Sequence, residues 1–220
     1  MRAIFLVLAA HAVAAHAVAL APASPPCYTP LNPAYETLCY TTAAAAGNVT
    51  VRVVGAGVDG VLLTGMSANT SFAAGSVASA TPVFEYFLMD NDAFTKVPLT
   101  VPLIFRPDPA GTWLASFALP TSVYASAAKA PGIVPGMDAL MEEFAPGKDG
   151  RMIAAWTFYT IQLAKDVDYT AACASLTAAL PGMGFAPVEG AWREAWVTYS
   201  TQAVVGDMIN ECWIEVAATM

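Results

Sequence analysis

Histidine is nearly absent from this 220-residue chain, which contains only His11 and His16. Both lie in the N-terminal segment 1–19, which has the features of a cleaved secretory signal. After cleavage the mature domain would have no histidine. Ser-His-Asp and Cys-His catalysis, histidine-ligated zinc and a proximal-histidine haem ligand would then all be excluded.

Charge is scarce beyond Arg2 in this N-terminal segment. A long apolar run follows the arginine, and Ala17-Val18-Ala19 fits a signal-peptidase site. Pro22 and the Pro25-Pro26 pair prevent a helix from continuing into the domain. We expect residues 1–19 to be a signal peptide, cleaved at about residue 19 to 26, and the protein to be secreted or to stay in the secretory-pathway lumen. An uncleaved anchor, or a signal used for further organelle targeting, is the alternative.

Basic residues are also few, with 9 Lys and Arg against 17 Asp and Glu, a net charge of −8. No basic patch is present in the sequence. Nucleic acid and anionic membrane surfaces are therefore poor partners. No stretch after the signal is long and apolar enough to span a bilayer, so we expect no membrane span after cleavage.

Cysteine occurs four times, without a C-x-x-C pair, which argues against a zinc site and favours disulfides in an exported chain. Cys27 and Cys39 flank the Asn32-Pro33 turn and would lie almost opposite one another in a hairpin. Cys173 lies on the apolar face of an expected helix, and Cys212 in the closing strand. We therefore pair Cys27 with Cys39 and Cys173 with Cys212. Four buried free thiols are the alternative.

Two sequons agree with export. They begin at Asn48 and Asn69, which are candidate glycosylation sites.

The segment 55–60, GAGVDG, has the glycine spacing of a dinucleotide-binding turn. Such a turn must lead from a strand into a helix, with an acidic residue about 20 positions on. Here the β-prone segment 61–65 follows, and no acidic residue occurs between Asp59 and Glu85. We interpret these glycines as turn formers.

Hydrophobic periodicity predicts two helices among antiparallel strands. Each half of the chain has the order β-β-α-β-β, which predicts a single α+β domain over 27–217, a distorted eight-stranded antiparallel barrel with two helices. The elements are a hairpin at 27–40, helices at 71–89 (kinked at Pro82) and 168–180, strands at 48–54, 97–105, 113–119, 139–145, 151–160, 194–200 and 211–216, and a surface loop at 120–136.

Five segments in this order resemble the SOUL or haem-binding protein family. They are CYTPLNPAYETLCY (27–40), LTVPL (99–103), SFALP (116–120), AKDVDYTAACASLTAAL (164–180) and NECWIEV (210–216). The resemblance covers the whole mature domain. It implies a distorted antiparallel barrel that binds haem or another tetrapyrrole in an apolar surface groove.

The ligand contacts of that family are only partly matched. Its basic haem contacts correspond to Val77, Glu85 and Val204, and its iron-binding histidine has no counterpart. Apolar positions persist at Ala80, Phe84, Val97 and Leu99, so we take these with Val77 and Val204 as the candidate ligand-binding residues. The resemblance thus implies a non-enzymatic exported binder of a tetrapyrrole or another flat apolar ligand, without an axial histidine and with no metal site. A hydrolase using a carboxylate, or a degenerate member with no small ligand, is the alternative.

Other residues favour structural roles. The tryptophans are expected in the core or at its rim. Glu142 and Glu143 face opposite sides of a strand and are expected at a solvated edge. Lys96 and Arg106 are isolated charges.

Overall fold

The structure is a computed structural model that describes residues 27–29, 32–54, 61–124, 127–143, 152–160, 166–190, 193–199 and 208–219. The expected signal peptide, the GAGVDG segment and Val204 lie outside these residues. No helix in the described ranges is long and apolar enough to cross a bilayer.

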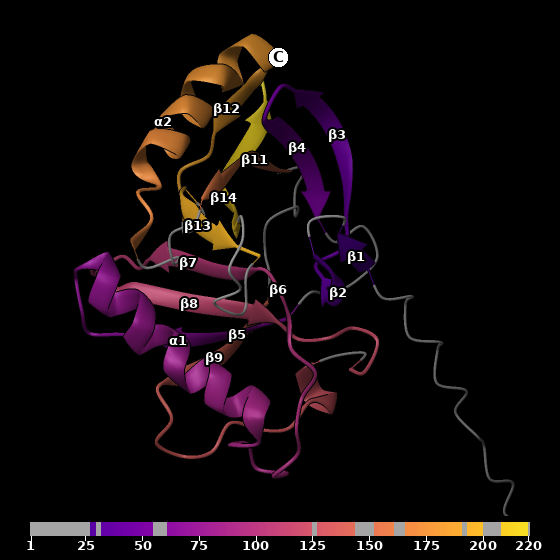
Figure 1. Cartoon of the computed structure of the whole chain (residues 1–220), viewed down its shortest axis with the longest axis vertical. Helices are drawn as coiled ribbons and strands as arrows, with labels where there is room; N and C mark the ends of the chain where they lie inside the picture. Colours follow the sequence, from indigo (N-terminus) through magenta and orange to yellow (C-terminus); the bar gives the residue numbers. More distant parts are fainter. Residues whose placement is uncertain are drawn as a thin grey trace, which may run out of the picture.

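Two helices pack on one large, mainly antiparallel sheet, which confirms the α+β class (Figure 1). The helices are α1 (Phe72–Leu88) and α2 (Thr170–Ala179), with short 3-10 turns η1 (Ala127–Lys129) and η3 (Leu180–Met183). The strands are β1 (Cys27–Thr29), β2 (Asn32–Thr37), β3 (Tyr40–Ala46), β4 (Val49–Val54), β5 (Val61–Met66), β6 (Thr100–Val101), β7 (Leu103–Pro107), β8 (Trp113–Ala118), β9 (Ala139–Glu143), β11 (Met152–Thr160), β12 (Phe185–Pro187), β13 (Ala195–Thr198) and β14 (Met208–Ala218).

The large sheet has ten strands in the order β3-β4-β11-β14-β13-β7-β8-β5-β9, and β12 also pairs with β14. Among the described residues no pairing joins β3 to β9, so the sheet is open and the expected closed barrel is not confirmed. A second sheet, β1-β2-β6, contains one parallel pairing, β2 with β6. The expected strand 97–105 is divided into β6 and β7 at Pro102.

When β3 and the short strands β6 and β12 are left aside, the β-β-α-β-β order occurs twice, as β4-β5-α1-β7-β8 and β9-β11-α2-β13-β14. The first strand of each half pairs with the other half: β4 with β11, and β9 with β5. The two halves also meet where β13 pairs with β7.

Both helices cover the same face of the large sheet, α1 on the first half and α2 on the second (Figure 1). Because successive strand residues face opposite sides, Leu63 of β5 packs in the α1 core while Leu62 packs in a core on the other face. That other core also contains Leu38 and Val101, near the ends of β2 and β6. Two apolar layers therefore enclose the sheet.

Helix α1 approaches β5 very closely at Gly65. A Cβ placed on Gly65 would lie 2.0 Å from the backbone oxygen of Ser79 and 2.8 Å from Val83 Cγ2. Gly75 has the same relation to Trp113, whose Cδ1 would lie 2.6 Å from an added Cβ. Only glycine allows the helix and sheet to meet at this distance.

Replacing Gly65 with Ala should lower the free energy of unfolding by about 1–3 kcal/mol, because the new methyl group forces α1 away from β5. Urea unfolding followed by circular dichroism measures the loss. Gly182→Ala is the matched control, because an added Cβ there meets nothing within 4 Å. Equal stability of the Gly65→Ala and Gly182→Ala variants would show that the close approach is not rigid.

A buried ion pair lies on the face of the sheet opposite the helices. Arg52 of β4 donates from both terminal nitrogens to Glu211 of β14, at 2.7 and 2.6 Å. Arg52 is 4% exposed and Glu211 is fully buried. The guanidinium carbon also lies 4.5 Å from the centre of the Tyr40 ring, a cation–π contact.

Three further donors converge on the Glu211 carboxylate. Thr157 donates to Oε1 at 2.8 Å, and Tyr199 and Trp213 donate to Oε2 at 2.9 and 2.6 Å. Burial alone would raise the pKa of Glu211. The hydrogen bonds and positive charge of Arg52, together with the hydrogen bonds from Trp213 and Thr157, outweigh the effect of burial. The pKa of Glu211 is therefore lowered below its ordinary value. The carboxylate therefore stays ionised inside the protein.

A second ion pair also joins strands of the two halves. Arg106 of β7 is buried and pairs with Glu142 of β9, which also accepts a hydrogen bond from Thr64 at 2.5 Å. Thr64 in turn is 2.7 Å from the hydroxyl of Ser116. The expectation of an isolated Arg106 is therefore wrong. Glu142 lies on β9, at the end of the strand order, but its side chain is only 29% exposed.

Replacing Glu211 with Gln should lower the free energy of unfolding by about 3–5 kcal/mol at neutral pH, because Arg52 would keep a buried charge without its counter-ion. Because the pKa of Glu211 is lower in the folded than in the unfolded protein, the ionised carboxylate stabilises the fold fully at pH values above the unfolded-state pKa of about 4.3. The difference between wild type and Glu211→Gln should therefore shrink as the pH falls below that value.

Denaturant unfolding at several pH values measures this difference, with Glu85→Gln, an exposed position on α1, as the control. A difference that stays constant down to pH 3 would contradict the assignment.

Candidate functional site

The starts of both helices meet in a cluster of aromatic rings. Phe72 begins α1, and its ring centre lies 4.8 Å from that of Trp113 and 4.5 Å from that of Trp196. Tyr169 immediately precedes α2 and stacks on Trp196, with centres 5.2 Å apart and planes 8° apart. The cluster therefore joins residues from the two halves of the fold.

A hollow of about 790 Å³ opens beside these rings. Its walls come from the β7–β8 turn with the strand ends beside it, from described residues just before β13, and from β13 itself. The lining residues are Pro107, Asp108, Pro109, Trp113, Glu189, Gly190, Arg193, Glu194 and Trp196. We call it the tryptophan pocket. Its size suits a small organic ligand, and its two indoles offer flat apolar contact.

The polar groups of the tryptophan pocket are held in place by hydrogen bonds. The Trp196 indole N–H donates to Glu194 Oε1 at 2.6 Å, which fixes the ring and the carboxylate together. Asp108 Oδ1 accepts the backbone N–H groups of Ala110 and Thr112, at 2.8 and 3.0 Å. Arg193 and Glu189 form an exposed ion pair at 3.2 Å.

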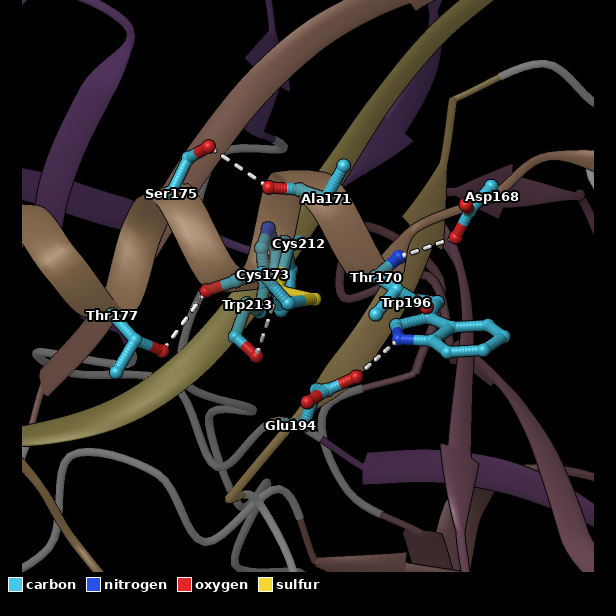
Figure 2. The surroundings of a disulfide bond; sticks show 10 residues. All are labelled: Asp168, Thr170, Ala171, Cys173, Ser175, Thr177, Glu194, Trp196, Cys212 and Trp213. Carbon is cyan, nitrogen blue, oxygen red and sulfur yellow. Dashed lines mark hydrogen bonds between the residues drawn. A yellow bond between two sulfur atoms is a disulfide. The ribbon is translucent and has the colours of Figure 1, made fainter.

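The expected Cys173–Cys212 disulfide is present and holds α2 against β14, with Cα atoms 5.3 Å apart. Figure 2 shows it below the start of α2, with Trp196 and Glu194 nearby. In the sheet register Cys212 lies directly opposite Trp196. The disulfide therefore holds α2, which directly follows Tyr169, on β14, the neighbour of the strand that carries Trp196.

Tyr169 is itself anchored at this point. Its hydroxyl donates to Asn210 Oδ1 at 3.0 Å, and burial raises its pKa well above the ordinary value. The phenol therefore stays neutral at physiological pH and serves as a fixed support for Trp196.

The candidate ligand-binding residues from the sequence lie elsewhere. Ala80 and Val97 are buried in the α1 core, and Phe84 and Leu99 pack against it. Val77 is 53% exposed on α1. The structure thus brings the first four together under α1, and none of these five residues lines the tryptophan pocket.

A second hollow, of about 540 Å³, lies beside α1 near Pro82. It is lined partly by the carboxylate-bearing residues Glu85, Asp90 and Asp138, which makes it markedly acidic. Glu85 is one of the positions where the resembled family has a basic residue. This hollow is therefore a poor site for a ligand with carboxylates.

Both sequon asparagines are exposed, Asn48 in the β3–β4 turn and Asn69 before α1. Their modification stays a prediction.

Cys39 is disulfide-bonded. The side chain of Cys27 lies outside the described part, so its pairing with Cys39 also stays a prediction. In the β1–β2 register Cys27 lies opposite Thr37, which is two residues before Cys39.

No protein-family model matches the chain, and a search of curated proteins finds no similar sequence. The described residues hold no group of three or more His, Cys, Asp or Glu side chains suited to a metal ion.

The residues that carry the SOUL resemblance have structural roles in this molecule. Glu36 accepts hydrogen bonds from the backbone N–H groups of Thr121 and Ser122, at 2.6 and 3.1 Å, and so fastens β2 to the segment after β8. Asn210 supports Tyr169, and Glu211 holds Arg52. These three residues therefore have structural contacts, and none of them lines the tryptophan pocket.

Sequence reasoning missed the tryptophan pocket. It placed Trp113 and Trp196 in the core or at its rim, which is where their rings lie, but it gave no sign that they border one hollow. The nearest signal is the run Glu189 to Trp196, where acidic residues and tryptophans alternate around Gly190.

Replacing both Cys173 and Cys212 with Ala should lower the free energy of unfolding by about 2–4 kcal/mol, because the unfolded chain loses its cross-link. Thermal unfolding of the oxidised wild type and the double variant measures it. Peptide mapping without reduction should recover the Cys173–Cys212 cross-link. Recovery of another partner for Cys212 would contradict the structure.

Proposed function

We propose that this chain is an exported, non-enzymatic binding protein with a SOUL-like fold, and that it holds a flat, largely apolar ring ligand in the tryptophan pocket. The observation that carries the proposal is the hollow of about 790 Å³ beside Trp113 and Trp196. The ring centres of these tryptophans lie 4.7 Å apart. Large aromatic side chains that border an open hollow provide a surface on which flat ligands stack.

A tetrapyrrole is the ligand class that the resemblance implies. The proposed site differs from the α1 groove that the resemblance suggests, because the apolar residues matched there are packed in the core. With no histidine after residue 16, the protein would hold haem without an axial imidazole. Haem binding is therefore expected to be weak.

Export is part of the same proposal. The expected signal at 1–19 and the two sequons support it, and the Cys173–Cys212 disulfide is compatible with an oxidising compartment. A degenerate SOUL-like protein with no small ligand remains the alternative within this fold.

A carboxylate hydrolase is the second candidate. The observation in its favour is that Asp108 and Glu194 line the same aromatic pocket, since glycoside hydrolysis uses paired carboxylates. Turnover of nitrophenyl glycosides that is abolished by both Asp108→Asn and Glu194→Gln would replace the binding proposal with this one.

Titration of the mature protein with 1-pyrenemethanol, an uncharged flat probe, should quench tryptophan fluorescence and saturate. Replacing Trp113 or Trp196 with Phe should weaken binding about three- to tenfold, the value of one aromatic contact. Trp156→Phe is the matched control, because Trp156 packs against the α2 core and does not line the pocket.

Haemin should bind weakly and without a six-coordinate low-spin spectrum.

If 1-pyrenemethanol binds saturably but Trp156→Phe weakens its binding as much as Trp113→Phe does, the binding site lies outside the tryptophan pocket. A tight six-coordinate haemin complex would contradict the expected absence of axial ligation. Absence of any saturable quenching would favour a protein with no small ligand.

A further inference from the structure

The charges around the tryptophan pocket are unequal. Three of its lining residues carry carboxylates, and Arg193 is the cation among the described lining residues. Arg193 is bonded to Glu189 at 3.2 Å, and both side chains are largely exposed, at 70% and 81%. These two charges offset one another, so Asp108 and Glu194 leave the pocket with a negative potential.

These two carboxylates are held rigidly enough to select a ligand. The indole N–H of Trp196 fixes Glu194 Oε1, and two backbone N–H groups fix Asp108 Oδ1. The described contacts thus engage one oxygen of each carboxylate. Each group has capacity for further hydrogen bonds, because an ionised carboxylate can accept about four.

The tryptophans act in the same direction as the carboxylates. The face of an indole ring carries negative charge density and attracts a cation within about 6 Å of its centre. Trp113 and Trp196 both line the hollow. One face of Trp196 is stacked on Tyr169, so an ammonium group in the pocket would meet the remaining indole surface of the two tryptophans together with the carboxylates. An anionic group would be repelled by the carboxylates.

We infer that the tryptophan pocket selects flat ring ligands that carry a positive charge, such as an aromatic amine or an organic ammonium, over neutral and anionic rings. This inference rests on the proposed function. It places dianionic haem among the disfavoured ligands and assigns Asp108 and Glu194 as the residues that determine the preference.

The test uses three probes that share the same pyrene ring and differ in charge. They are the cationic 1-pyrenemethylammonium, the neutral 1-pyrenemethanol and the anionic 1-pyrenecarboxylate. Their dissociation constants for the mature protein are measured by quenching of tryptophan fluorescence at neutral pH and low salt. We expect the ammonium to bind about tenfold more tightly than the carboxylate, with the alcohol between them. The preference should shrink at high salt, because the pocket is open to solvent.

Two substitutions remove charge while keeping shape. Glu194→Gln retains a side-chain oxygen to accept the Trp196 indole N–H, and Asp108→Asn retains one for Ala110 and Thr112. Each should reduce the ammonium preference about two- to fivefold, as for a partly exposed ion pair, and weaken binding of the alcohol less than binding of the ammonium. Glu85→Gln, outside the pocket, controls for the change in net charge.

The outcomes separate this inference from the proposed function. If none of the three probes binds saturably, the proposed function fails. If all three bind through Trp113 and Trp196 with equal affinity, or the carboxylate binds best, the proposed function stands and the charge preference is overturned. A preference that Glu85→Gln reduces as much as Glu194→Gln would assign it to overall charge and overturn the role of the pocket carboxylates.

Discussion

The Glu211 carboxylate connects four neighbouring parts of the large sheet. It binds Arg52 of β4, Thr157 of β11 and Trp213 of its own strand β14, and it accepts the hydroxyl of Tyr199, directly after β13. Burying both charges is costly unless every partner is in place. A shift of one residue in β14 would turn Glu211 toward the apolar α2 face. The charge pair therefore penalises wrong registers in the second half of the fold.

The tryptophan pocket lies where the two halves meet, at the pairing of β13 with β7. Phe72 and Trp113 come from the first half, and Tyr169 and Trp196 from the second. The rings pack edge to face or in stacks between the helix starts. A site built in this way depends on the relative placement of both halves, which the shared sheet maintains, while the disulfide holds α2 on β14 within the second half.

The sequence predicted what depends on local pattern. Periodicity located α1 and α2 to within about two residues, and the position of Cys173 on an apolar helix face identified its partner. It did not predict features that depend on long-range pairing. Arg106 and Glu142 are 36 residues apart in the chain and meet only because β9 joins the first half. The pocket was missed for the same reason, since Trp113 and Trp196 are brought together by the sheet.

The exchange of first strands between the halves has a consequence for how the chain acquires its structure. Strand β4 is made early, yet its partner β11 lies about 100 residues later, so this pairing cannot form until most of the domain has been synthesised. Such non-local contacts slow folding, because loop closure must precede them. Neither half can complete its sheet alone. A ribosome-bound first half would therefore leave β4 without β11 and β5 without β9. A chain assembled in this order therefore stays incompletely folded until its second half is available.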